Sequence, residues 1–483
     1  MDICIIGTGY VGLVTGASLA YLGNTVNCVD IDAEKIEKLR VGISPIYEPG
    51  IADLIESGLK AGRLSFTTDL NEAMLSAEVI FIAVGTPPLE DGSPDLGQVK
   101  VAAQEIGRAI LASRDYRRLR IIVNKSTVPI GSGNWVEMLA REQIRSLINS
   151  SAFSGEEGGD ESSRQVRSLV EEISASVIVV SNPEFLREGT AIRDTFYPDR
   201  IVIGANDERS IEVLERLYRP LLEQSFRPPE SIDPRPPSLK SVPLVTTDLT
   251  SAEMIKYAAN AFLAMKISFA NEIANVCEQT GADIVSVMKG IGLDNRIGSS
   301  FLNAGVGWGG SCFGKDISAL IQIAREYNYM PSLLEAVSEV NHRQRYLPVQ
   351  KLQGALKIIK GRTIGLLGLA FKPDTDDVRD APSFNIASDL LKMGARVKVF
   401  DPIAMDSFRS QNESLDVIYE PGVEELAADC DALVVITEWE EFRRLDLNEL
   451  FRAMPGSVLI DGRNIFDPKA AAQAGFNYIS IGR

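Results

Sequence analysis

The first thirty residues hold the pattern that most restricts the fold of this chain. An apolar run, MDICII, is followed by GTGYVG at residues 7–12, by an apolar stretch to Leu22 and by a second run, TVNCVD, which ends in Asp30. This order predicts a strand, a tight turn, a helix and a second strand. Glycines in such a turn let a pyrophosphate approach the helix N-terminus, and an acid after the second strand can bind a ribose, which favours NAD over NADP. A glycine-rich turn that binds nothing is the alternative.

Composition excludes several classes of protein. Residues 3–29 carry no charge and could be mistaken for a membrane span, but five glycines interrupt them and no basic segment precedes them. We therefore expect a cytoplasmic protein with neither a membrane helix nor a signal peptide. The net charge of -17 argues against nucleic acid as a partner, because a phosphate backbone requires a basic surface. The five cysteines are widely spaced and contain no CxxC pair, so we expect neither a disulfide framework nor a metal site.

The chain divides into three blocks. Short apolar runs alternate with helical segments in the first block and again in the last, which predicts two Rossmann-like, doubly wound α/β domains. Between them, a TSAE capping pattern and Gly281 bound one long helix over 251–280, so a central helical domain is expected. The predicted domains are 1–215, 216–345 and 346–483. A Ser/Gly/Glu-rich segment at 149–164 is predicted to be a loop, and the proline-rich segment 226–237 an extended excursion.

Several motifs of the first block follow predicted strands. Thr86 and Thr127 stand in GTP and STVP motifs after the runs at 79–85 and 120–126, and NPEFLREG follows the run at 176–182. Ligands of open α/β sheets bind outside the carboxyl ends of the strands, so these motifs are candidate walls of a binding crevice. Each motif alone is also consistent with ordinary turn chemistry or with a capped, solvated helix start.

The long helix and the last block carry further polar candidates. Lys256 and Asn260 are four residues apart and share one face of a helix that is otherwise mostly apolar. They either point into a polar pocket or form an exposed stripe. Lys372, Arg379 and Arg463 lie near the ends of predicted strands of the last block, where they either bind an anionic ligand or remain surface charges.

The segment GVGWGGSCFGKD, residues 305–316, places Cys312 in a glycine-rich stretch before a predicted helix. A helix N-terminus lowers the pKa of a nearby thiol, and Lys315 would add to this effect, so a reactive thiolate is predicted. The glycines would let a substrate or cofactor approach the backbone closely. The alternative is a small buried apolar residue, which is what we expect of Cys4 and Cys28 in their strands.

Taken together, six of these motifs resemble the UDP-glucose/GDP-mannose dehydrogenase family. They are GTGYVG, KSTVP, NPEFLREG, AEMIKYAANAF, GWGGSCFGKD and FKPDTDDVRDAP, and the resemblance extends from Met1 to about Arg463. Within the family, NRIGSSFLNAG before GGSCFGKD is more similar to the members that act on UDP-glucose than to those that act on GDP-mannose. The sequence departs from the family pattern at Gly314, where many members have proline, and in the longer segments 149–164 and 226–237.

The resemblance implies an NAD-dependent four-electron oxidation of UDP-glucose to UDP-glucuronate, with two NAD reduced per sugar. The catalytic residues that it implies are Cys312, Lys256, Asn260, Asp316, Thr127 and Glu184. The cysteine would add to an aldehyde intermediate and carry a thioester after the second hydride transfer. The lysine and the asparagine would stabilise developing oxyanions, and the threonine and the two carboxylates would position or activate water and relay protons.

The resemblance also implies two binding sites and a partner subunit. The NAD site would contain Gly7, Gly9, Tyr10, Val11, Gly12, Asp30, Lys35, Thr86, Thr127, Glu188, Lys315 and Arg379. The UDP-sugar site would contain Glu184, Phe185, Leu186, Arg187, Glu188, Lys256, Asn260, Arg296, Phe301, Leu302, Asn303, Ala304, Gly305, Gly309, Lys372 and Arg463. Arg296 would reach the site of a neighbouring subunit, since family members pair through their central helices. A homodimer or higher homo-oligomer is therefore expected.

Two other functions remain open from the sequence. A relative that oxidises another nucleotide sugar, such as GDP-mannose or a UDP-N-acetylhexosamine, would share most of the motifs. A non-catalytic NAD-binding redox sensor would use only the reactive thiol. The combination of Lys256, Asn260, Cys312 and Asp316 speaks against the sensor, because a sensor needs no oxyanion stabiliser.

Overall fold

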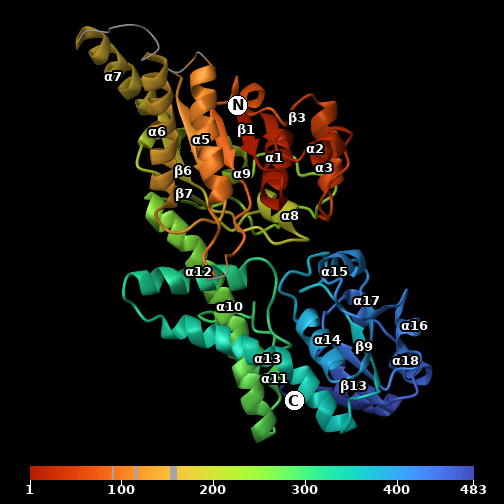
Figure 1. Cartoon of the computed structure of the whole chain (residues 1–483). Coiled ribbons are helices and arrows are strands. Elements are labelled where there is room, and N and C mark those ends of the chain that lie inside the picture. The colour runs from red at the N-terminus through yellow and green to blue at the C-terminus, as the bar shows by residue number, and fades with distance from the viewer. Residues whose placement is uncertain (90–91, 114, 116–117, 153–159) are drawn as a thin grey trace. The chain divides into compact units, whose positions relative to one another are not determined.

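The computed structural model describes residues 1–483 except 90–91, 114, 116–117 and 153–159. The chain forms two compact units, Met1–Tyr257 and Ala258–Arg483. The border between them falls inside the long helix α10 (Leu249–Thr280), which begins two residues before the predicted position and ends where predicted (Figure 1). Among the described residues, no helix is long and apolar enough to cross a membrane.

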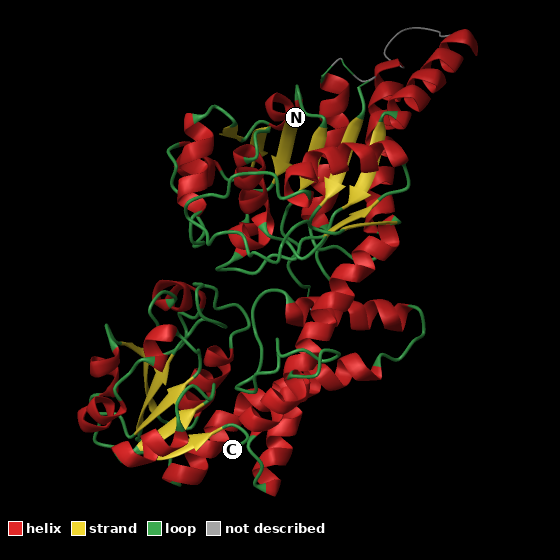
Figure 2. Cartoon of the chain, turned by 180° about the vertical axis from the view of Figure 1, so that it is seen from behind, coloured by secondary structure: helices red, strands yellow, loops and turns green. Residues whose placement is uncertain are grey.

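The N-terminal unit is built around a β-sheet flanked by helices (Figure 2). Its described strands follow the order β3-β2-β1-β4-β5-β6-β7-β8. The strands are β1 (Asp2–Ile6), β2 (Thr25–Val29), β3 (Leu64–Thr67), β4 (Val79–Ile82), β5 (Arg120–Asn124), β6 (Val177–Ser181), β7 (Ile201–Gly204) and β8 (Leu244–Thr247). All neighbours pair in parallel except β6 and β7. The order reverses between β1 and β4, so the loops that follow these strands border the crevice where ligands of such sheets bind.

Helices cover both faces of this sheet. They are α1 (Tyr10–Tyr21), α2 (Ala33–Arg40), α3 (Ile51–Lys60), α4 (Leu70–Met74), α5 (Gly97–Ala112), α6 (Ser132–Ala152), α7 (Asp160–Ala175), α8 (Ala191–Phe196) and α9 (Glu208–Leu222). Alternate residues of the strands enter different cores: Ile3 and Phe81 pack in one cluster, and Cys4 and Ile80 in another. This double burial explains why the strands read as continuous apolar runs. It also confirms that Cys4 and Cys28 are buried apolar residues.

The C-terminal unit combines helices with a second parallel sheet. After α10 come α11 (Ile284–Gly292), α12 (Phe313–Glu326) and α13 (Ser332–Leu356). The sheet has the order β11-β10-β9-β12-β13-β14, and all its described pairs are parallel. Its strands are β9 (Thr363–Leu367), β10 (Arg396–Phe400), β11 (Ile418–Tyr419), β12 (Ala432–Val435), β13 (Val458–Asp461) and β14 (Asn477–Ser480). The strand order reverses between β9 and β12, as it does in the N-terminal sheet.

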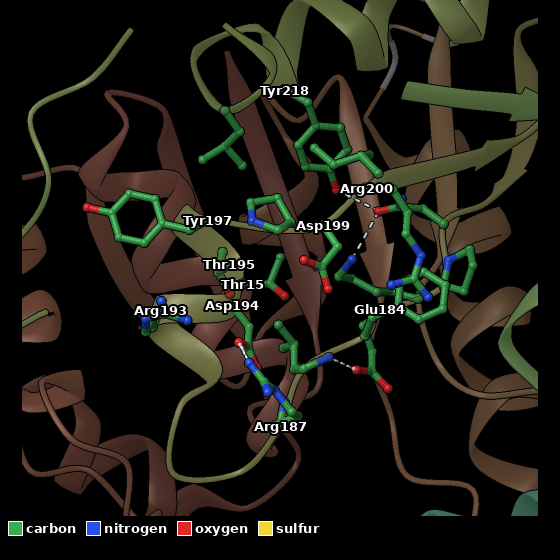
Figure 3. A pocket seen from close by; sticks show the side chains of 18 of the residues that line it. Thr15, Glu184, Arg187, Arg193, Asp194, Thr195, Tyr197, Asp199, Arg200 and Tyr218 are labelled. Atoms are coloured by element: carbon green, nitrogen blue, oxygen red, sulfur yellow. Dashed lines mark hydrogen bonds and ion pairs between the residues drawn. The ribbon is translucent and has the colours of Figure 1, made fainter. Parts of the chain in front are cut away.

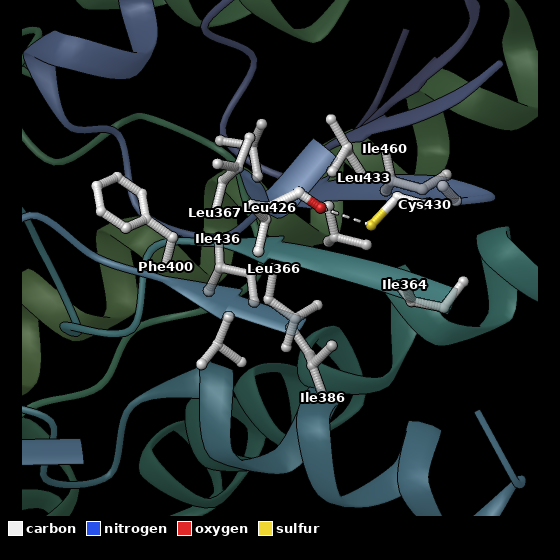
Figure 4. Close-up of a cluster of buried hydrophobic side chains, with 14 of the residues drawn as sticks. Ile364, Leu366, Leu367, Ile386, Phe400, Leu426, Cys430, Leu433, Ile436 and Ile460 are labelled. Carbon is white, nitrogen blue, oxygen red and sulfur yellow. Dashed lines mark hydrogen bonds between the residues drawn. The ribbon is translucent and has the colours of Figure 1, made fainter. Parts of the chain in front are cut away.

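The core of this second sheet is almost entirely apolar. Ile364 and Leu366 face Ile386 of the flanking helix α14, whereas Leu433 lies on the opposite face of the sheet, near Leu426 and Cys430 (Figure 4). The other flanking helices are α15 (Met405–Gln411), α16 (Val423–Ala427), α17 (Glu440–Arg443), α18 (Leu447–Ala453) and α19 (Pro468–Ala474), while α14 spans Pro382–Lys392. The predicted fold class, two Rossmann-like sheets and a helical middle with one long helix, is therefore confirmed.

The structure agrees with the prediction for the proline-rich segment 226–237 but not with the predicted bounds of the loop at 149–164. Residues 149–152 belong to α6 and residues 160–164 to α7, so the predicted loop over 149–164 is too long at both ends, while residues 153–159 lie outside the described part of the chain. Serine and glutamate are tolerated in helices, and composition alone therefore misplaces such boundaries. The segment 226–237 contains neither helix nor strand, as its five prolines predict.

Candidate functional site

The glycine turn after β1 has the geometry that a dinucleotide needs. Gly7 has a φ of +100°, and a Cβ placed on it would lie 2.5 Å from the carbonyl oxygen of Ala83. A Cβ on Gly12 would lie 2.0 Å from the carbonyl oxygen of Gly7. At Gly9, which caps α1, a Cβ would meet no atom within 4 Å. The first and third glycines are thus required by packing, while the second leaves the helix N-terminus open to a ligand, and the turn fits a bound pyrophosphate.

Asp30 lies beside this turn, as the sequence predicts. One carboxylate oxygen of Asp30 accepts hydrogen bonds from the Thr8 hydroxyl at 2.6 Å, the Thr8 backbone N–H at 2.9 Å and the Lys35 ammonium at 2.9 Å. Partial burial opposes ionisation, but these donors outweigh it and lower the pKa of Asp30. The carboxylate is therefore held ionised at the edge of the turn, where it can accept a ribose hydroxyl.

The two Thr-Pro loops meet at the carboxyl ends of β4 and β5. The Thr86 hydroxyl donates a hydrogen bond of 2.8 Å to the backbone carbonyl of Thr127. The pairing of β4 with β5 brings the loops together, although the two threonines are 41 residues apart. Both motifs therefore border the same crevice, which turn chemistry alone would not require.

Glu184 and Lys256 form a buried ion pair in the N-terminal unit. The Lys256 ammonium lies 2.6 Å from a Glu184 carboxylate oxygen and donates a second hydrogen bond of 2.8 Å to the Glu184 backbone carbonyl. Their side chains are only 6% and 7% exposed. The other carboxylate oxygen accepts the backbone N–H of Leu186 at 2.6 Å. Burial alone would raise the pKa of Glu184, but the charge of Lys256 and these hydrogen bonds lower it.

A pocket behind the NPEFLREG loop contains residues that the sequence reasoning did not select (Figure 3). Lys125, at the end of β5, donates a 3.0 Å hydrogen bond to the side-chain oxygen of Asn182, which also accepts the Tyr218 hydroxyl at 2.6 Å. Desolvation lowers the pKa of Lys125 to about 8, and the nearby Lys256 contributes to the shift although Glu184 opposes it. Its place in the KSTVP motif, directly after a buried strand, was the available signal.

The other side chains of this loop have defined partners. The Arg200 guanidinium lies 3.6 Å from the centre of the Phe185 ring. Arg187 is mostly exposed and forms a 2.5 Å ion pair with Asp194 (Figure 3). Glu188 is half-buried. The loop is therefore fixed by contacts on both sides and does not form the solvated helix start that was the alternative.

The candidate nucleophile lies in the C-terminal unit. Cys312 is exposed and is the N-cap residue of α12, with its sulfur 3.5 Å from the Ser311 hydroxyl. Four residues later, Asp316 is buried and accepts a 2.6 Å hydrogen bond from the side-chain amide of Asn260 on α10. Lys315 forms a 3.0 Å ion pair with the other oxygen of Asp316. The thiol and Asp316 thus lie one turn apart at the start of α12, and Asp316 is joined there to Asn260 of α10.

The glycine run before Cys312 is packed against protein atoms. A Cβ on Gly309 would lie 2.3 Å from the Asp380 carbonyl oxygen, and one on Gly310 would lie 2.8 Å from the Phe371 ring. The backbone N–H of Trp308 also donates a 2.8 Å hydrogen bond to Asn341. These glycines let the loop pack closely on the segment between β9 and α14, which differs from the sequence expectation that they leave room for a ligand. Their direct contact with a sugar stays a prediction.

The three predicted cations of the C-terminal unit, Arg463, Lys372 and Arg379, differ in the groups that they contact. Arg463 is 13% exposed and donates a 2.6 Å hydrogen bond to the Ile436 carbonyl at the carboxyl end of β12. Lys372 follows the end of β9, with its ammonium 5.6 Å from the Phe371 ring centre. Arg379 forms a 2.8 Å ion pair with Asp377. These three cations lie near the carboxyl ends of neighbouring strands, where an anionic ligand would bind.

Residues 296–304, which precede the glycine run, include both buried and exposed side chains. Leu302 and Ala304 are buried in a core cluster, so only their backbone is available to a ligand, while Asn303 is exposed. Phe301 has a φ of +64°, a strained value for a side chain of this size. Arg296 is 87% exposed and forms a 2.6 Å ion pair with Asp294. The sequence could not separate the buried members of this segment from the exposed ones.

The predicted catalytic residues therefore form two groups. Thr127, Glu184 and Lys256 belong to the N-terminal unit, and Asn260, Cys312 and Asp316 to the C-terminal unit. Helix α10 carries one residue of each group, because the border between the units passes between Lys256 and Asn260.

Comparison with known proteins identifies relatives over the whole chain. Models of the UDP-glucose/GDP-mannose dehydrogenase family match in three successive parts: the NAD binding domain at residues 1–222, the central domain at 250–343 and the UDP binding domain at 365–468. The chain is 43% identical to UDP-glucose 6-dehydrogenase YwqF of Bacillus subtilis, covering 100% of this chain and 98% of the relative. It is 44% identical to the UDP-glucose 6-dehydrogenase of Rhizobium meliloti, covering 100% of both chains.

A solved structure is also similar over nearly the full length. The UDP-glucose dehydrogenase from the hyperthermophilic archaeon Pyrobaculum islandicum superimposes with a TM-score of 0.83 at 36% identity. The match covers 99% of this chain and 97% of that chain.

Proposed function

Because this chain belongs to the UDP-glucose/GDP-mannose dehydrogenase family, we propose that it oxidises UDP-glucose to UDP-glucuronate with NAD as the oxidant. The observation that carries this proposal is Cys312, an exposed thiol at the start of α12, next to the buried Asn260–Asp316 pair. A thiol in this position suits an oxidation that passes through an aldehyde, because a covalent bond retains the reactive intermediate.

The proposed reaction consists of two successive oxidations at C6 of the sugar, followed by hydrolysis of a thioester. The C6 hydroxyl loses a proton and C6 loses a hydride, which gives an aldehyde. The Cys312 sulfur then adds to the aldehyde carbon, and the thiohemiacetal loses a second hydride and a proton to give a thioester. Water attacks the thioester carbon and the carbon–sulfur bond breaks. One proton of the water restores the thiol, and the other is released as the product ionises to the carboxylate. Bound NAD supplies the hydride acceptor in each of the two oxidations.

The remaining catalytic residues support the charges of these steps. Lys256 and Asn260 are positioned to stabilise oxyanions at C6, since both carry N–H donors and both side chains are buried. Asp316 is an acceptor one turn after the thiol, and its hydrogen bond orients the Asn260 amide. Glu184 and Thr127 position the water that cleaves the thioester. The lowered pKa of Glu184 keeps it an acceptor at neutral pH, so it orients water and takes up a proton only transiently.

We assign NAD to the turn Gly7–Gly12 with Asp30 and Lys35, because Gly9 leaves that helix N-terminus open. The other NAD contacts proposed are Tyr10, Val11, Thr86, Thr127, Glu188, Lys315 and Arg379. The UDP-sugar contacts proposed are those that the family resemblance implies: Glu184 to Glu188, Lys256, Asn260, Arg296, Phe301 to Gly305, Gly309, Lys372 and Arg463.

We further propose that the chain is divided into an NAD-binding domain, a central helical domain and a UDP-sugar domain. We place the boundaries near residues 215 and 345. The three successive family matches, at 1–222, 250–343 and 365–468, support a division into three parts.

The assembly that we propose is a homodimer or higher homo-oligomer paired through the central helices. Phe262, Phe269 and Val276 recur every seven residues along α10, and their side chains are 57%, 50% and 52% exposed. Large apolar residues on one stripe of a helix are costly in water and typical of a face that a partner covers. We also propose a cytoplasmic location, because the exposed Cys312 must remain a free thiol to act.

The decisive experiment measures the NADH released per UDP-glucose consumed. A ratio of two is expected, and a ratio near one, or no turnover, contradicts the proposal. GDP-mannose and UDP-N-acetylglucosamine, offered at the same concentration, test the related substrates. Faster turnover of either one reassigns the substrate within the family. Replacing Cys312 by serine should abolish overall turnover, and an unimpaired variant would reject the thioester route.

A further inference from the structure

Three distant segments of the N-terminal unit meet at one buried carboxylate, that of Glu48. This residue stands in the irregular stretch before α3 and is 5% exposed. Its neighbours come from the start of α1, from the end of the NPEFLREG loop and from the start of α8. These helices contact one another in one corner of the unit, α1 lying against both α3 and α8 (Figure 1). Glutamate is almost never buried in a protein unless it is paired, so this position requires an explanation.

The contacts of Glu48 are specific. One carboxylate oxygen accepts the Tyr10 hydroxyl and, at 2.7 Å, the backbone N–H of Gly189. The other oxygen accepts the backbone N–H of Ile192 at 3.2 Å. The Gly189 N–H also lies 2.9 Å from the Tyr10 hydroxyl oxygen, which closes a three-membered network. Every donor reaches Glu48 from a segment at least 38 residues away in the sequence.

Two of these segments carry the binding sites assigned above. Tyr10 is the first residue of α1 and lies inside the proposed dinucleotide turn. Gly189 directly follows Glu184–Glu188, the proposed sugar loop, and has a φ of +81° that only glycine adopts readily. We propose that Glu48 is a positioning residue, whose carboxylate fixes the sugar loop to the dinucleotide turn and so sets the distance between the two substrates. This role rests on the proposed function for its consequence in catalysis.

The chemistry of the network requires the carboxylate form of Glu48. Burial raises the pKa of Glu48, while hydrogen bonds from Tyr10, Ile192 and Gly189 oppose that rise. Burial and the neighbouring carboxylate raise the pKa of Tyr10, so its hydroxyl keeps its proton and acts as a donor to Glu48. A glutamine in place of Glu48 would turn an N–H₂ group towards one of these donors. One contact would then be lost and two donors would face each other.

The proline-rich segment 226–237 packs against residues that flank this network, Gly50 and Phe196. A Cβ on Gly50, two residues after Glu48, would lie 2.6 Å from the Ser231 hydroxyl oxygen. Phe226 lies 5.3 Å from Phe196, the last residue of α8, measured between ring centres. The excursion therefore holds the Glu48 stretch and α8 against each other. This packing gives the segment a role that its composition did not indicate.

The test compares Glu48→Gln with Glu56→Gln in the full-length protein. Glu56 lies on α3, is 60% exposed and pairs only with Lys60 in the described contacts, so it serves as a matched control. Steady-state kinetics with UDP-glucose and NAD are measured for both variants. Hydrogen exchange is followed in peptides that cover residues 183–193, with β10 as an internal reference. Tyr10→Phe is measured alone and combined with Glu48→Gln.

The expected result is a KM for UDP-glucose raised about tenfold by Glu48→Gln, the loss typical of a buried hydrogen bond to a charged group, and unchanged by Glu56→Gln. The amides of residues 183–193 should exchange at least tenfold faster, with β10 unaffected. Tyr10→Phe should add less in the Glu48→Gln background than in the wild type, because both changes break one network.

Two results would overturn the positioning role. One is an unchanged KM in folded Glu48→Gln protein, with only the yield of folded protein reduced, since a purely structural residue behaves in that way. The other is unchanged exchange of residues 183–193. If Glu48→Gln does not fold, Tyr10→Phe, which leaves the Glu48–Gly189 bond in place, is held to the same criteria with a smaller shift. If the wild type does not oxidise UDP-glucose, the proposed function fails, and the exchange data alone decide whether Glu48 holds the loop.

Discussion

Replacing Lys256 by methionine tests whether the buried ion pair with Glu184 matters through charge or through packing. The ammonium and the carboxylate are 2.6 Å apart and their side chains are 6% and 7% exposed, so solvent screens the pair little. Removing one partner of a buried pair costs roughly 3–5 kcal/mol, because the other charge is left without compensation. Lys125 and the Leu186 N–H remain near Glu184, so we expect a loss of about 3 kcal/mol at pH 7.

The pH dependence distinguishes the two explanations. In the wild type the folded pKa of Glu184 lies below its ordinary value of 4.5, so the stabilisation from this group is complete above that pH and is lost as the pH falls through the folded pKa. Without Lys256, burial dominates and the pKa of Glu184 rises. Protonation then relieves the buried charge, and the cost of the substitution should shrink as the pH is lowered from 7 to 5.5.

Urea unfolding, followed by hydrogen exchange in peptides from β5 and β6, measures the stability of this unit separately from the rest of the chain. The control is Lys60→Met, which breaks the exposed Lys60–Glu56 pair, and its cost should stay within about 0.5 kcal/mol. A cost of Lys256→Met that does not change between pH 7 and 5.5 would refute the charge explanation and assign the loss to packing.

Four other outcomes follow from the structure. Gly309→Ala should prevent correct packing of the Cys312 loop, because its Cβ would lie 2.3 Å from the Asp380 carbonyl oxygen, and circular dichroism with activity would report this loss. Gly354→Ala, where a Cβ in α13 meets no atom within 4 Å, should instead stabilise the protein by up to about 1 kcal/mol in thermal unfolding. Burial lowers the folded pKa of Lys125 to about 8, so the unfolded chain binds more protons than the folded one above that pH. The free energy of unfolding of the wild type should therefore rise by up to about 1.4 kcal/mol per pH unit above pH 8. Lys125→Met should remove this rise in urea titrations. Phe269→Asp should shift the protein toward the monomer in sedimentation velocity, and an unchanged mass would place the subunit interface elsewhere.

Most of the fold could be predicted from local patterns. The alternation of apolar runs and helical segments located both sheets, and the capping pattern with Gly281 located the end of α10. Such features depend on residues close in the sequence, so a single chain reveals them. Boundaries in the polar segment 149–164 were predicted poorly, because serine and glutamate occur in helices and in loops.

The candidate site could be predicted only in part. Cys312 and Asn260 stood out by residue type and spacing, whereas Asp316 was implied only by the family resemblance. The 2.6 Å bond between Asn260 and Asp316 joins two helices and has no local signal. Lys125 was not selected as a site residue, and only the packing of Asn182 and Tyr218 around it shows its environment.

The sequence by itself determined the glycine turn, the acid that follows β2 and the thiol at a helix N-terminus, because each depends on a few consecutive residues. The tertiary structure decided what the glycines before Cys312 do and what Glu48 binds. At Gly309 and Gly310 the space for a side chain is taken by a carbonyl and a ring more than 60 residues away. At Glu48 the donors come from three segments that only the packed sheet and helices bring together. Burial and pairing across such distances are properties of the folded chain, and no local pattern encodes them.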